Sequence, residues 1–380
     1  MTKVITLGAG MVGSLIAADL AKEPGFEVLA VDRSAESLAK AEALAGRLGV
    51  RIRTTTADCS DQATIAKLAG EADVVCGALA SHLGRDALET IAKSGSAYVD
   101  ISFMPEDALE LDALAKEHGA RCVVDMGVAP GMSNLLAGVV ARELAPCELL
   151  RIFVGGLPKE RFKPYEYKAG FAPADVIEEY TRPARLVVDG KTVIREALTE
   201  PEPIAFPGVG TLEAFNTDGL RSLADTLDVP DMAEKTLRYP GHIDLMRAMR
   251  DTGLFSKEPV EVNGVSVVPL ELTSKLLFPL WTYEEGEADL TVMRIFGEAR
   301  GQRVQWDVYD ELDPSVNTTS MARTTAFPAA IVARMLADGT ISEPGVHAPE
   351  AFAGRDDILQ RLLSELGERG VRYERTKTSI

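Results

Sequence analysis

The sequence has no long apolar run and a deficit of positive charge. No stretch approaches the roughly 18 consecutive apolar residues of a membrane-spanning helix, and no signal peptide is visible. We therefore expect a cytoplasmic protein that does not enter a membrane. Lysine and arginine total 40 against 58 acidic residues, which gives a formal net charge of −18. This charge argues against nucleic acid or an anionic membrane surface as a partner.

The sequence is also poor in cysteine and histidine, with four of each among 380 residues. The cysteines contain no C-x-x-C pair, so we expect reduced, buried thiols; they are Cys59, Cys76, Cys122 and Cys147. The histidines lack metal-ligand spacing, and no metal is predicted. The remaining composition, 46% hydrophobic and 26% charged, is typical of a globular protein with two or three domains.

A glycine motif near the start predicts a dinucleotide site. "GAGMVG" places Gly8, Gly10 and Gly13 in a G-x-G-x-x-G pattern, which is weak evidence by itself. Here a buried-strand pattern, "VITL", precedes it and an apolar helical pattern follows it. A second strand pattern, "FEVLAVD", ends on Asp32 at the distance expected for a ribose-binding acid. In this context the helix N-terminus would hold the pyrophosphate.

The same context predicts NAD rather than NADP. The carboxylate of Asp32 can accept hydrogen bonds from the ribose hydroxyls and would repel a 2′-phosphate. Arg33 leaves an alternative open, because its side chain could cover the adenine or hold that phosphate. The complete expected cofactor set is Gly8, Gly10, Met11, Val12, Gly13, Asp32, Arg33, Asp58, Ala78, Leu79, Ala80 and Ser102.

Strand and helix patterns alternate over the first 130 residues, which predicts an α/β fold with a Rossmann-type doubly wound parallel sheet. The carboxyl ends of its strands, residues 78–81, 100–103 and 127–131, should line one crevice. We therefore assign residues 1–130 to a dinucleotide-binding domain.

Antiparallel strand patterns with Asp-Gly, Asn-Gly and Arg-Gly turns follow, with helical segments between them. They predict an inserted α+β substrate and dimerisation domain over 131–315. "VEVNGVSVVPLEL" is included among these strands. Residues 316–380 should return to the first domain, beginning with the helix "SMARTTAFPAAIVARMLADG" and ending in a disordered "RTKTSI" tail.

Several longer motifs resemble the saccharopine dehydrogenase-like family. They are "VVDMGVAPGMSNLLAG", "EAFNTDGLRSL", "TLRYPGHIDLM", "SMARTTAFPAAI" and "EPGVHAPE". The resemblance itself extends over nearly the whole chain. Together, "FMPED", "APGMSN" and "RYPGH" look most like the lysine 6-dehydrogenase branch. The resemblance implies NAD-dependent oxidation of the Cε–N bond of lysine, with release of ammonia and the 6-semialdehyde. It also implies a homodimer or larger homo-oligomer.

Two alternatives remain beside this interpretation. Sister branches act on saccharopine or carboxynorspermidine and share much of the same sequence frame. Saccharopine-type members often carry tryptophan where this chain has Phe171, which mildly disfavours saccharopine. A protein of another class, which binds NAD(P) without catalysis, would share the fold but lack the reaction.

The candidate catalytic residues are Asp100 and His242. Asp100, at the end of "YVD", could hold the substrate amine or accept its proton, or it could merely cap the next segment. His242, in "RYPGH", is suited to proton transfer near neutrality, although a hydrogen-bonded structural role is equally compatible.

The remaining candidates are expected to bind substrate. Arg238 is the first candidate for the substrate carboxylate, because a planar guanidinium can make two parallel hydrogen bonds, and Arg221 is the second. Small residues around "GVAPGMSN" would let backbone approach the nicotinamide and substrate. The expected substrate-binding set is Gly127, Asn134, Tyr167, Lys168, Arg221 and Arg238.

Overall fold

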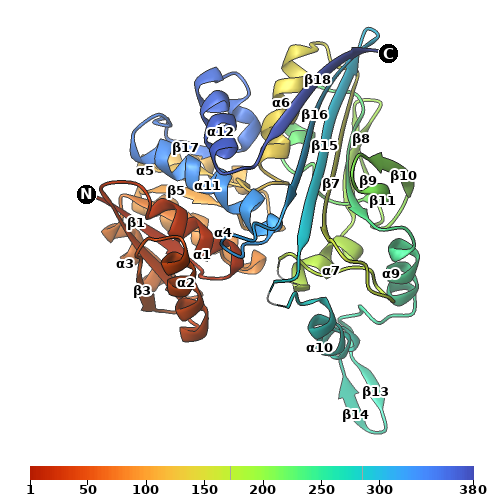
Figure 1. The fold of residues 1–380 in the computed structure, drawn as a ribbon, viewed down its shortest axis with the longest axis horizontal. Coiled ribbons are helices and arrows are strands. Elements are labelled where there is room, and N and C mark those ends of the chain that lie inside the picture. Colours follow the sequence, from red (N-terminus) through yellow and green to blue (C-terminus); the bar gives the residue numbers. More distant parts are fainter. Residues whose placement is uncertain (172, 285) are drawn as a thin grey trace. The chain divides into compact units, whose positions relative to one another are not determined.

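The computed structural model describes residues 1–171, 173–284 and 286–380. The chain divides into two compact units, which are described separately (Figure 1). The first unit comprises Met1–Glu143 and Ala322–Tyr373, and the second comprises Leu144–Met321 and Glu374–Ile380. The second unit is thus inserted into the first, while the last residues of the chain return to the second. No helix in the described ranges is long and apolar enough to cross a membrane.

The first unit contains a seven-stranded parallel sheet in the order β17-β6-β5-β4-β1-β2-β3. Its strands are β1 (Thr2–Leu7), β2 (Phe26–Asp32), β3 (Arg53–Thr56), β4 (Val74–Gly77), β5 (Ala97–Asp100), β6 (Arg121–Val123) and β17 (Gly345–His347). The strand order reverses between β1 and β4, so the neighbouring βα loops open a crevice there. This confirms the Rossmann-type prediction.

Helices connect these strands and cover the sheet (Figure 1). They are α1 (Met11–Leu20), α2 (Ala35–Arg47), α3 (Gln62–Glu71), α4 (Ser81–Ser94), α5 (Asp112–His118), α6 (Met132–Glu143), α11 (Ser320–Ala337) and α12 (Asp356–Glu368), with short 3₁₀ turns η1 (Ala108–Leu111) and η2 (Pro349–Phe352). Apolar residues of α3, α4 and α5 form one core with the strands, including Ile65, Leu88 and Ala115. The sheet is therefore buried by helices, as parallel sheets require.

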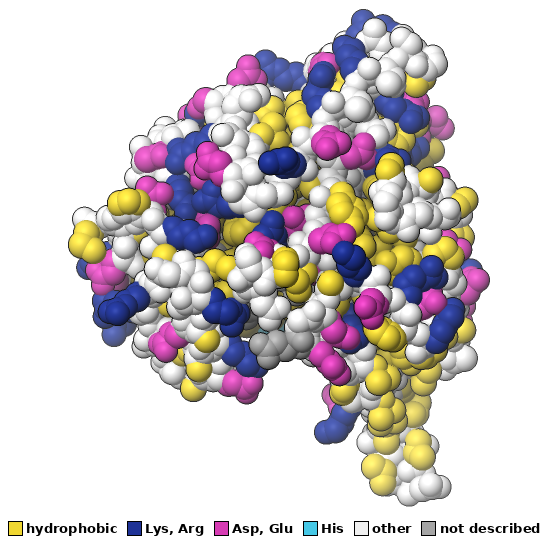
Figure 2. Space-filling view, in the orientation of Figure 1, with side chains coloured by type: hydrophobic (Ala, Val, Ile, Leu, Met, Phe, Trp, Pro, Cys, Tyr) yellow, Lys and Arg dark blue, Asp and Glu magenta, His cyan; other side chains and the backbone are white. Residues whose placement is uncertain are grey.

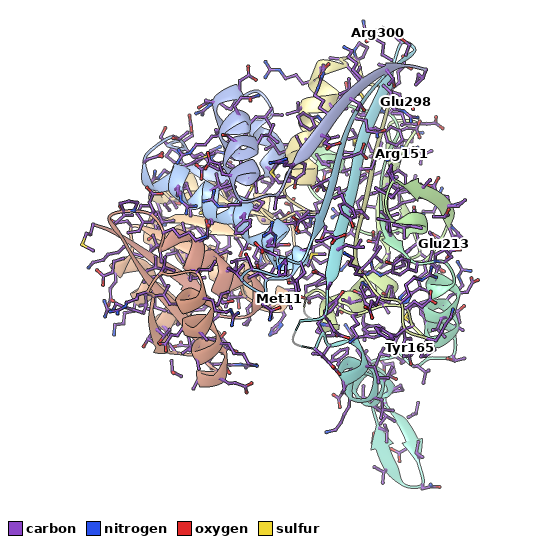
Figure 3. All side chains as sticks on the ribbon, viewed as in Figure 1. Met11, Arg151, Tyr165, Glu213, Glu298 and Arg300 are labelled. Atoms are coloured by element: carbon purple, nitrogen blue, oxygen red, sulfur yellow. The ribbon has the colours of Figure 1, made fainter. Side chains whose placement is uncertain are left out.

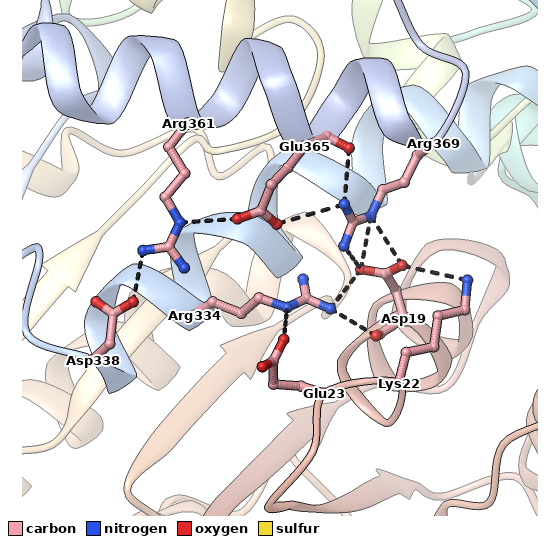
Figure 4. Close-up of polar contacts among 8 residues, drawn as sticks. All are labelled: Asp19, Lys22, Glu23, Arg334, Asp338, Arg361, Glu365 and Arg369. Carbon is pink, nitrogen blue, oxygen red and sulfur yellow. Dashed lines mark hydrogen bonds and ion pairs between the residues drawn. The ribbon is translucent and has the colours of Figure 1, made fainter.

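A buried ion-pair network joins α1 to the C-terminal helices of the same unit (Figure 4). The carboxylate of Asp19 accepts hydrogen bonds from Arg334 of α11 and from Arg369, which follows α12, at 3.0–3.1 Å. Burial alone would raise the pKa of Asp19, but the two guanidinium groups hold it below its ordinary value. The network fixes the helix that begins at the glycine motif against the returning segment.

The second unit is built around a nine-stranded mixed sheet. Its strands are β7 (Leu149–Pro158), β8 (Ala184–Val188), β9 (Lys191–Arg195), β10 (Glu202–Phe206), β11 (Gly210–Asn216), β12 (Met232–Arg238), β15 (Asp289–Ala299), β16 (Gln302–Glu311) and β18 (Tyr373–Ser379). A separate hairpin comprises β13 (Val260–Val262) and β14 (Val265–Val267). The helices are α7 (Pro173–Thr181), α8 (Leu223–Thr226), α9 (His242–Asp251) and α10 (Pro269–Trp281).

Three sequence expectations for the second unit need correction or refinement. Residues 375–380 were expected to form a disordered tail, yet most of them belong to β18, which lies beside β16. The strand pattern in "VEVNGVSVVPLEL" ends after the hairpin, because Pro269 begins α10, where proline favours a first helical position. The boundary expected at residue 130 lies before α6, which belongs to the first compact unit.

Candidate functional site

The loop between β1 and α1 is packed so tightly that two of its glycines leave no room for a side chain. A Cβ on Gly13 would lie 2.1 Å from the carbonyl oxygen of Gly8. Gly8 has a φ of +91°, and a Cβ there would lie 2.3 Å from the carbonyl oxygen of Ala78, which follows β4. A Cβ on Gly10 would meet no atom of the described residues within 4 Å. Gly8 and Gly13 are thus close-packed against neighbouring backbone, whereas the space beside Gly10 is open.

The first turn of α1 presents the positive end of a helix at this opening. Gly10 is the N-cap residue and, as a glycine, has no side chain of its own with which to cap the helix. Met11, the first helical residue, is 42% exposed (Figure 3). A helix start with a glycine N-cap beside open glycine backbone fits a pyrophosphate, because backbone N–H groups and the helix dipole favour an anion.

Asp32, at the end of β2, supports this loop directly. One carboxylate oxygen accepts a hydrogen bond from the Ala9 amide at 2.8 Å, and the other accepts one from the Ser34 amide at 2.8 Å. The ribose-binding candidate therefore also orders the glycine loop. Each carboxylate oxygen has a second lone pair with which it could accept a ribose hydroxyl.

Asp58 and Arg33 add one charge of each sign in this region. Asp58 accepts hydrogen bonds from the Ser60 amide and hydroxyl, which hold its pKa below the ordinary value. The positive charge of Arg33 lowers this pKa further. The carboxyl ends of β2 and β3 therefore carry two carboxylates and one guanidinium.

The carboxyl end of β4 forms the other side of the glycine loop. The Ala78 amide donates to Leu7 of β1, and its carbonyl oxygen faces Gly8. Leu79 and Ala80 continue toward α4. The structure thus brings the expected cofactor residues of β1, α1, β2 and β4 into one region of the first unit.

Asp100, the last residue of β5, is completely buried. Its Oδ1 accepts hydrogen bonds from the Tyr98 hydroxyl at 3.0 Å and the Ser102 hydroxyl at 2.8 Å. Its Oδ2 has no hydrogen-bond partner among the described residues. Burial raises the pKa of Asp100 to about 6, although the hydrogen bonds from Ser102 and Tyr98 oppose this shift. The second oxygen could therefore accept a proton or a hydrogen bond from a bound amine.

The segment from Gly127 to Asn134 forms a compact turn before α6. Gly131 has a φ of +138°, and a Cβ there would lie 2.0 Å from the carbonyl oxygen of Gly127. Ser133 donates a hydrogen bond to the side-chain oxygen of Asn134 at 2.8 Å. Both side chains are buried, so a structural role is established for this turn independently of any contact with substrate.

In the second unit, Arg238 lies in a buried cluster rather than on the surface. Its guanidinium forms an ion pair with Glu179 of α7 and lies 4.4 Å from the ring centroid of Tyr167. Its Nε donates to the Tyr180 hydroxyl at 3.3 Å. Burial alone would lower the pKa of Arg238, but the tyrosines and Glu179 raise it, so the guanidinium stays charged. A substrate carboxylate would have to share this guanidinium with Glu179.

His242, at the start of α9, belongs to the same cluster. Its Nε2 lies 2.9 Å from the Tyr180 hydroxyl, and its Nδ1 lies 2.9 Å from the carbonyl oxygen of Tyr165, the residue labelled in Figure 3. Burial and the positive charge of Arg238 lower the pKa of His242 to about 3. The neutral ring therefore fits the hydrogen-bonded structural alternative, and its catalytic assignment stays a prediction.

The other two substrate-binding candidates have separate surroundings. Lys168 forms an ion pair with Glu287 and lies 5.9 Å from the ring centroid of Tyr283. Arg221 is buried with a φ of +53°. Of the six expected substrate-binding residues, Tyr167 and Arg238 are in contact in the second unit. Gly127 and Asn134 lie near each other in the first unit, in the turn that leads into α6 and in the first turn of α6.

Sequence reasoning missed Glu179 and Glu234. Glu234 is buried on β12, where its carboxylate accepts hydrogen bonds from the Thr217 hydroxyl at 2.5 Å and the Gly219 amide at 3.1 Å. Burial raises the pKa of Glu234 to about 8 against these hydrogen bonds. The only available signal was its four-residue separation from Arg238, which puts both side chains on one face of a strand.

Comparisons with known proteins agree with this architecture. The saccharopine dehydrogenase NADP binding domain matches residues 4–123, and the saccharopine dehydrogenase C-terminal domain matches residues 127–371. The NADP(+), L-glutamate-forming saccharopine dehydrogenase of Schizosaccharomyces pombe is 21% identical over 98% of each chain. The enzyme of the same name from Saccharomyces cerevisiae is 22% identical over 96% of this chain and 97% of its own.

A solved structure supports the fold over the complete chain. Apo saccharopine dehydrogenase (L-Glu forming) from Saccharomyces cerevisiae matches with a TM-score of 0.80, 19% identity and complete coverage of both chains. Its likeness shows the same fold, and the two family domains together span nearly all of the sequence. The chain belongs to the saccharopine dehydrogenase family of oxidoreductases.

Proposed function

We propose that the chain oxidises the Cε–N bond of a lysine skeleton with a pyridine nucleotide as hydride acceptor. The observation that carries this proposal is the match along nearly the whole chain to enzymes named saccharopine dehydrogenase. The match includes both the nucleotide-binding domain and the C-terminal domain. This favours an enzyme over a protein that only binds nucleotide.

Saccharopine and lysine are the two candidate substrates, and they differ in the amine that leaves. Oxidation of saccharopine would release glutamate, whereas oxidation of lysine would release ammonia; both would yield the 6-semialdehyde. The names of the relatives favour saccharopine. Lysine remains a candidate because the alignment spans 455 residues although this chain has 380, so the fission yeast enzyme carries segments that this chain lacks. Phe171 stands where saccharopine-type members often carry tryptophan, which also disfavours saccharopine.

The residues of the first unit fit a pyridine nucleotide. The start of α1, with its glycine N-cap, and the open space at Gly10 would receive the pyrophosphate, and Asp32 would bind the adenosine ribose. When bound, the nicotinamide supplies a hydride acceptor. We propose NAD as the preferred nucleotide because Asp32 and Asp58 put two carboxylates at the carboxyl ends of β2 and β3, where a 2′-phosphate would be repelled. The relatives named above use NADP, so this choice needs a direct test.

The substrate amine must be neutral for hydride to leave the neighbouring carbon. A lysine amine has a pKa of about 10.4 in water, so the oxidative rate should rise from neutral to alkaline pH. We propose that Oδ2 of Asp100, which has no hydrogen-bond partner in the described part of the chain, positions the amine. Asp100 could then transfer protons as water adds to the imine and the amine departs. We propose that Arg238 binds the substrate carboxylate, which would compete with Glu179 for the guanidinium.

A substrate and cofactor panel tests the proposal. Saccharopine, lysine, ornithine and a carboxylated polyamine would each be incubated with NAD or NADP, while nucleotide reduction, glutamate and ammonia are measured. We expect reduction with saccharopine or lysine, with one equivalent of glutamate or ammonia respectively. No reduction with any substrate, despite measurable nucleotide binding, would instead support the non-catalytic alternative.

The role of Asp100 can be tested in the same assay. Asp100→Asn should lower turnover on the order of 100-fold, the usual scale for losing a general acid or base, with nucleotide affinity unchanged. His242→Asn should cost less if its role is structural. Turnover of Asp100→Asn within a few-fold of the parent at every pH would exclude Asp100 from catalysis.

A further inference from the structure

Strand β5 ends with a tyrosine and an aspartate whose side chains meet in the interior of the first unit. Tyr98 and Asp100 are both completely buried, and the Tyr98 hydroxyl donates a hydrogen bond to Oδ1 of Asp100 at 3.0 Å. Residues two apart share one face of a strand, so the strand itself brings the two side chains together. The Ser102 hydroxyl donates to the same oxygen at 2.8 Å. Oδ1 therefore accepts from two donors, while Oδ2 has no partner among the described residues.

Gly77 of β4 leaves the space in which the tyrosine and the aspartate meet. It lies beside Asp100 in the register of the parallel strands β4 and β5. A Cβ on Gly77 would lie 2.0 Å from the hydroxyl oxygen of Tyr98 and 2.3 Å from Oδ1 of Asp100. A glycine within a strand weakens the strand and marks a place where other atoms approach closely. Here the approaching atoms are the two that form the hydrogen bond.

The Tyr98 hydroxyl keeps its proton and stays a donor. Burial and the negative charge of Asp100 hold the pKa of Tyr98 well above its ordinary value. The thiols of Cys122 on β6 and Cys76 on β4 raise this pKa further. Tyr98 therefore donates to Asp100 at every pH at which the protein is folded, and it does not itself exchange a proton with a substrate.

Neutral groups hold Asp100, in contrast to carboxylates at the surface. On the face of the molecule that Figure 2 shows, acidic side chains lie beside lysines and arginines. The titratable groups that interact with Asp100 from β5, β6 and the segment after β6 are not cations; they are Tyr98, Cys122 and Asp125. A guanidinium in their place would lower the pKa of the carboxyl and bind both oxygens. The hydroxyls of Tyr98 and Ser102 instead bind one oxygen and only partly offset the effect of burial, so the pKa of the carboxyl is about 6.

We propose that Tyr98 is a positioning residue: its hydroxyl, accommodated by Gly77, holds Oδ1 of Asp100 so that Oδ2 is the oxygen left for the substrate amine. This inference rests on the proposed function, in which Asp100 holds that amine. The last torsion of an aspartate side chain is soft, so an unheld carboxylate would present either oxygen over a broad range of angles. Fixing Oδ1 presents Oδ2 in one orientation before the substrate arrives, which lowers the entropic cost of the reactive geometry.

Carbon-13 NMR of the full chain, labelled at the aspartate side-chain carboxyl carbons, tests the inference without substrate. The signal of Asp100 is identified by its loss in Asp100→Asn. Tyr98→Phe should raise the pKa of Asp100 by about 1, because the ionised carboxylate loses one hydrogen bond. Tyr239→Phe is the matched control, since Tyr239 is a buried tyrosine of the second unit whose hydroxyl donates to the carbonyl oxygen of Pro158 at 2.9 Å. It should leave the pKa of Asp100 unchanged.

The pH dependence of kcat/KM is a second readout, which a merely structural role of Tyr98 would not move. The acid limb of the profile should follow Asp100, because the carboxyl must be ionised to hold the amine. In Tyr98→Phe this limb should shift to higher pH by the same amount, so that kcat/KM falls about tenfold on the acid side. Tyr239→Phe should keep the profile of the parent.

An unchanged pKa of Asp100 in folded Tyr98→Phe would overturn the inference, and so would a raised pKa with an unmoved acid limb. If Tyr98→Phe does not fold, 3-fluorotyrosine at position 98 keeps the hydroxyl and makes it a stronger donor. This variant should lower the pKa of Asp100, and an unchanged pKa would overturn the inference. Failure of the proposed function has a different signature, because the parent itself would then reduce no nucleotide with any substrate, whatever the pKa of Asp100 in the variants.

Discussion

The two units build their candidate sites in different ways. In the first unit, the glycine loop, the start of α1 and the end of β4 offer mainly backbone groups, held in place by close packing. In the second unit, the cluster around Arg238 consists of side chains from α7, β12 and α9. Changes in the first site should therefore act through steric fit and ligand binding. Changes in the second should act through stability as well as through substrate binding, because Arg238 is buried and paired with Glu179.

The two catalytic candidates show the same contrast. Asp100 retains one buried oxygen with no hydrogen-bond partner among the described residues and has a pKa of about 6, which leaves it able to exchange a proton. His242 uses both ring nitrogens in hydrogen-bond contacts and has a pKa near 3. A pKa suited to proton transfer therefore belongs to the aspartate of the first unit, although histidine is the usual choice near neutral pH.

The largest effect on stability should come from removing one member of the Arg238–Glu179 ion pair in the second unit. Arg238→Ala leaves the Glu179 carboxylate without its buried partner and should lower the free energy of unfolding by about 3–5 kcal/mol. The control, Arg238→Met combined with Glu179→Gln, removes both charges and should lose less. Urea unfolding measures both. A single variant as stable as the parent would show that the pair is not buried in solution.

The next effect concerns the pH dependence that Asp100 gives to stability. Its pKa is raised from 3.8 to about 6, so its contribution is fully favourable below pH 4 and is lost as pH rises through 6. Asp100→Asn removes this dependence. The free energy of unfolding of the variant minus that of the parent should therefore increase by up to about 3 kcal/mol between pH 4 and 7. A difference that is flat with pH would mean that Asp100 has an ordinary pKa.

A smaller effect should follow from adding one methyl group to the glycine loop. Gly13→Ala forces a Cβ against the carbonyl oxygen of Gly8, so overpacking should lower the free energy of unfolding by about 1–3 kcal/mol, and the displaced loop should bind nucleotide more weakly than the parent. Gly10→Ala is the matched control, because its Cβ would enter open space at the same loop. It should therefore cost the apo protein less stability than Gly13→Ala. Fluorescence titration with NADH measures nucleotide binding by each variant, and thermal unfolding measures its stability. Equal stability loss in both variants would contradict the packing argument.

The smallest effect should be a change of cofactor preference. Asp32→Ala removes the carboxylate that orders the loop and faces the ribose, so it should narrow the preference for NAD over NADP by about tenfold, or 1.4 kcal/mol. The ratio of kcat/KM for the two nucleotides measures this. A parent enzyme that already prefers NADP would refute the NAD assignment and give Arg33 the phosphate-binding role.

The first unit was largely predictable because its signals are local. The glycine motif, the following helix and Asp32 lie within 25 residues, and each has a distinct physical requirement. The Arg238–Glu179 pair could not be predicted in this way, since its members are 59 residues apart and nothing in either segment specifies the other. β18 was missed because nearly all its side chains are exposed, so it has no alternation of apolar and polar residues.

The fate of hydrogen on the substrate tests the central claim most directly. Saccharopine and lysine carrying two deuterium atoms on the Cε of the lysine skeleton would be incubated separately with enzyme and oxidised nucleotide. Mass spectrometry of the reduced nucleotide then shows whether hydride came from that carbon. The account predicts one deuterium in each molecule of NADH or NADPH formed with at least one of the two substrates. Reduced nucleotide without deuterium, or no reduction by either substrate, would contradict it.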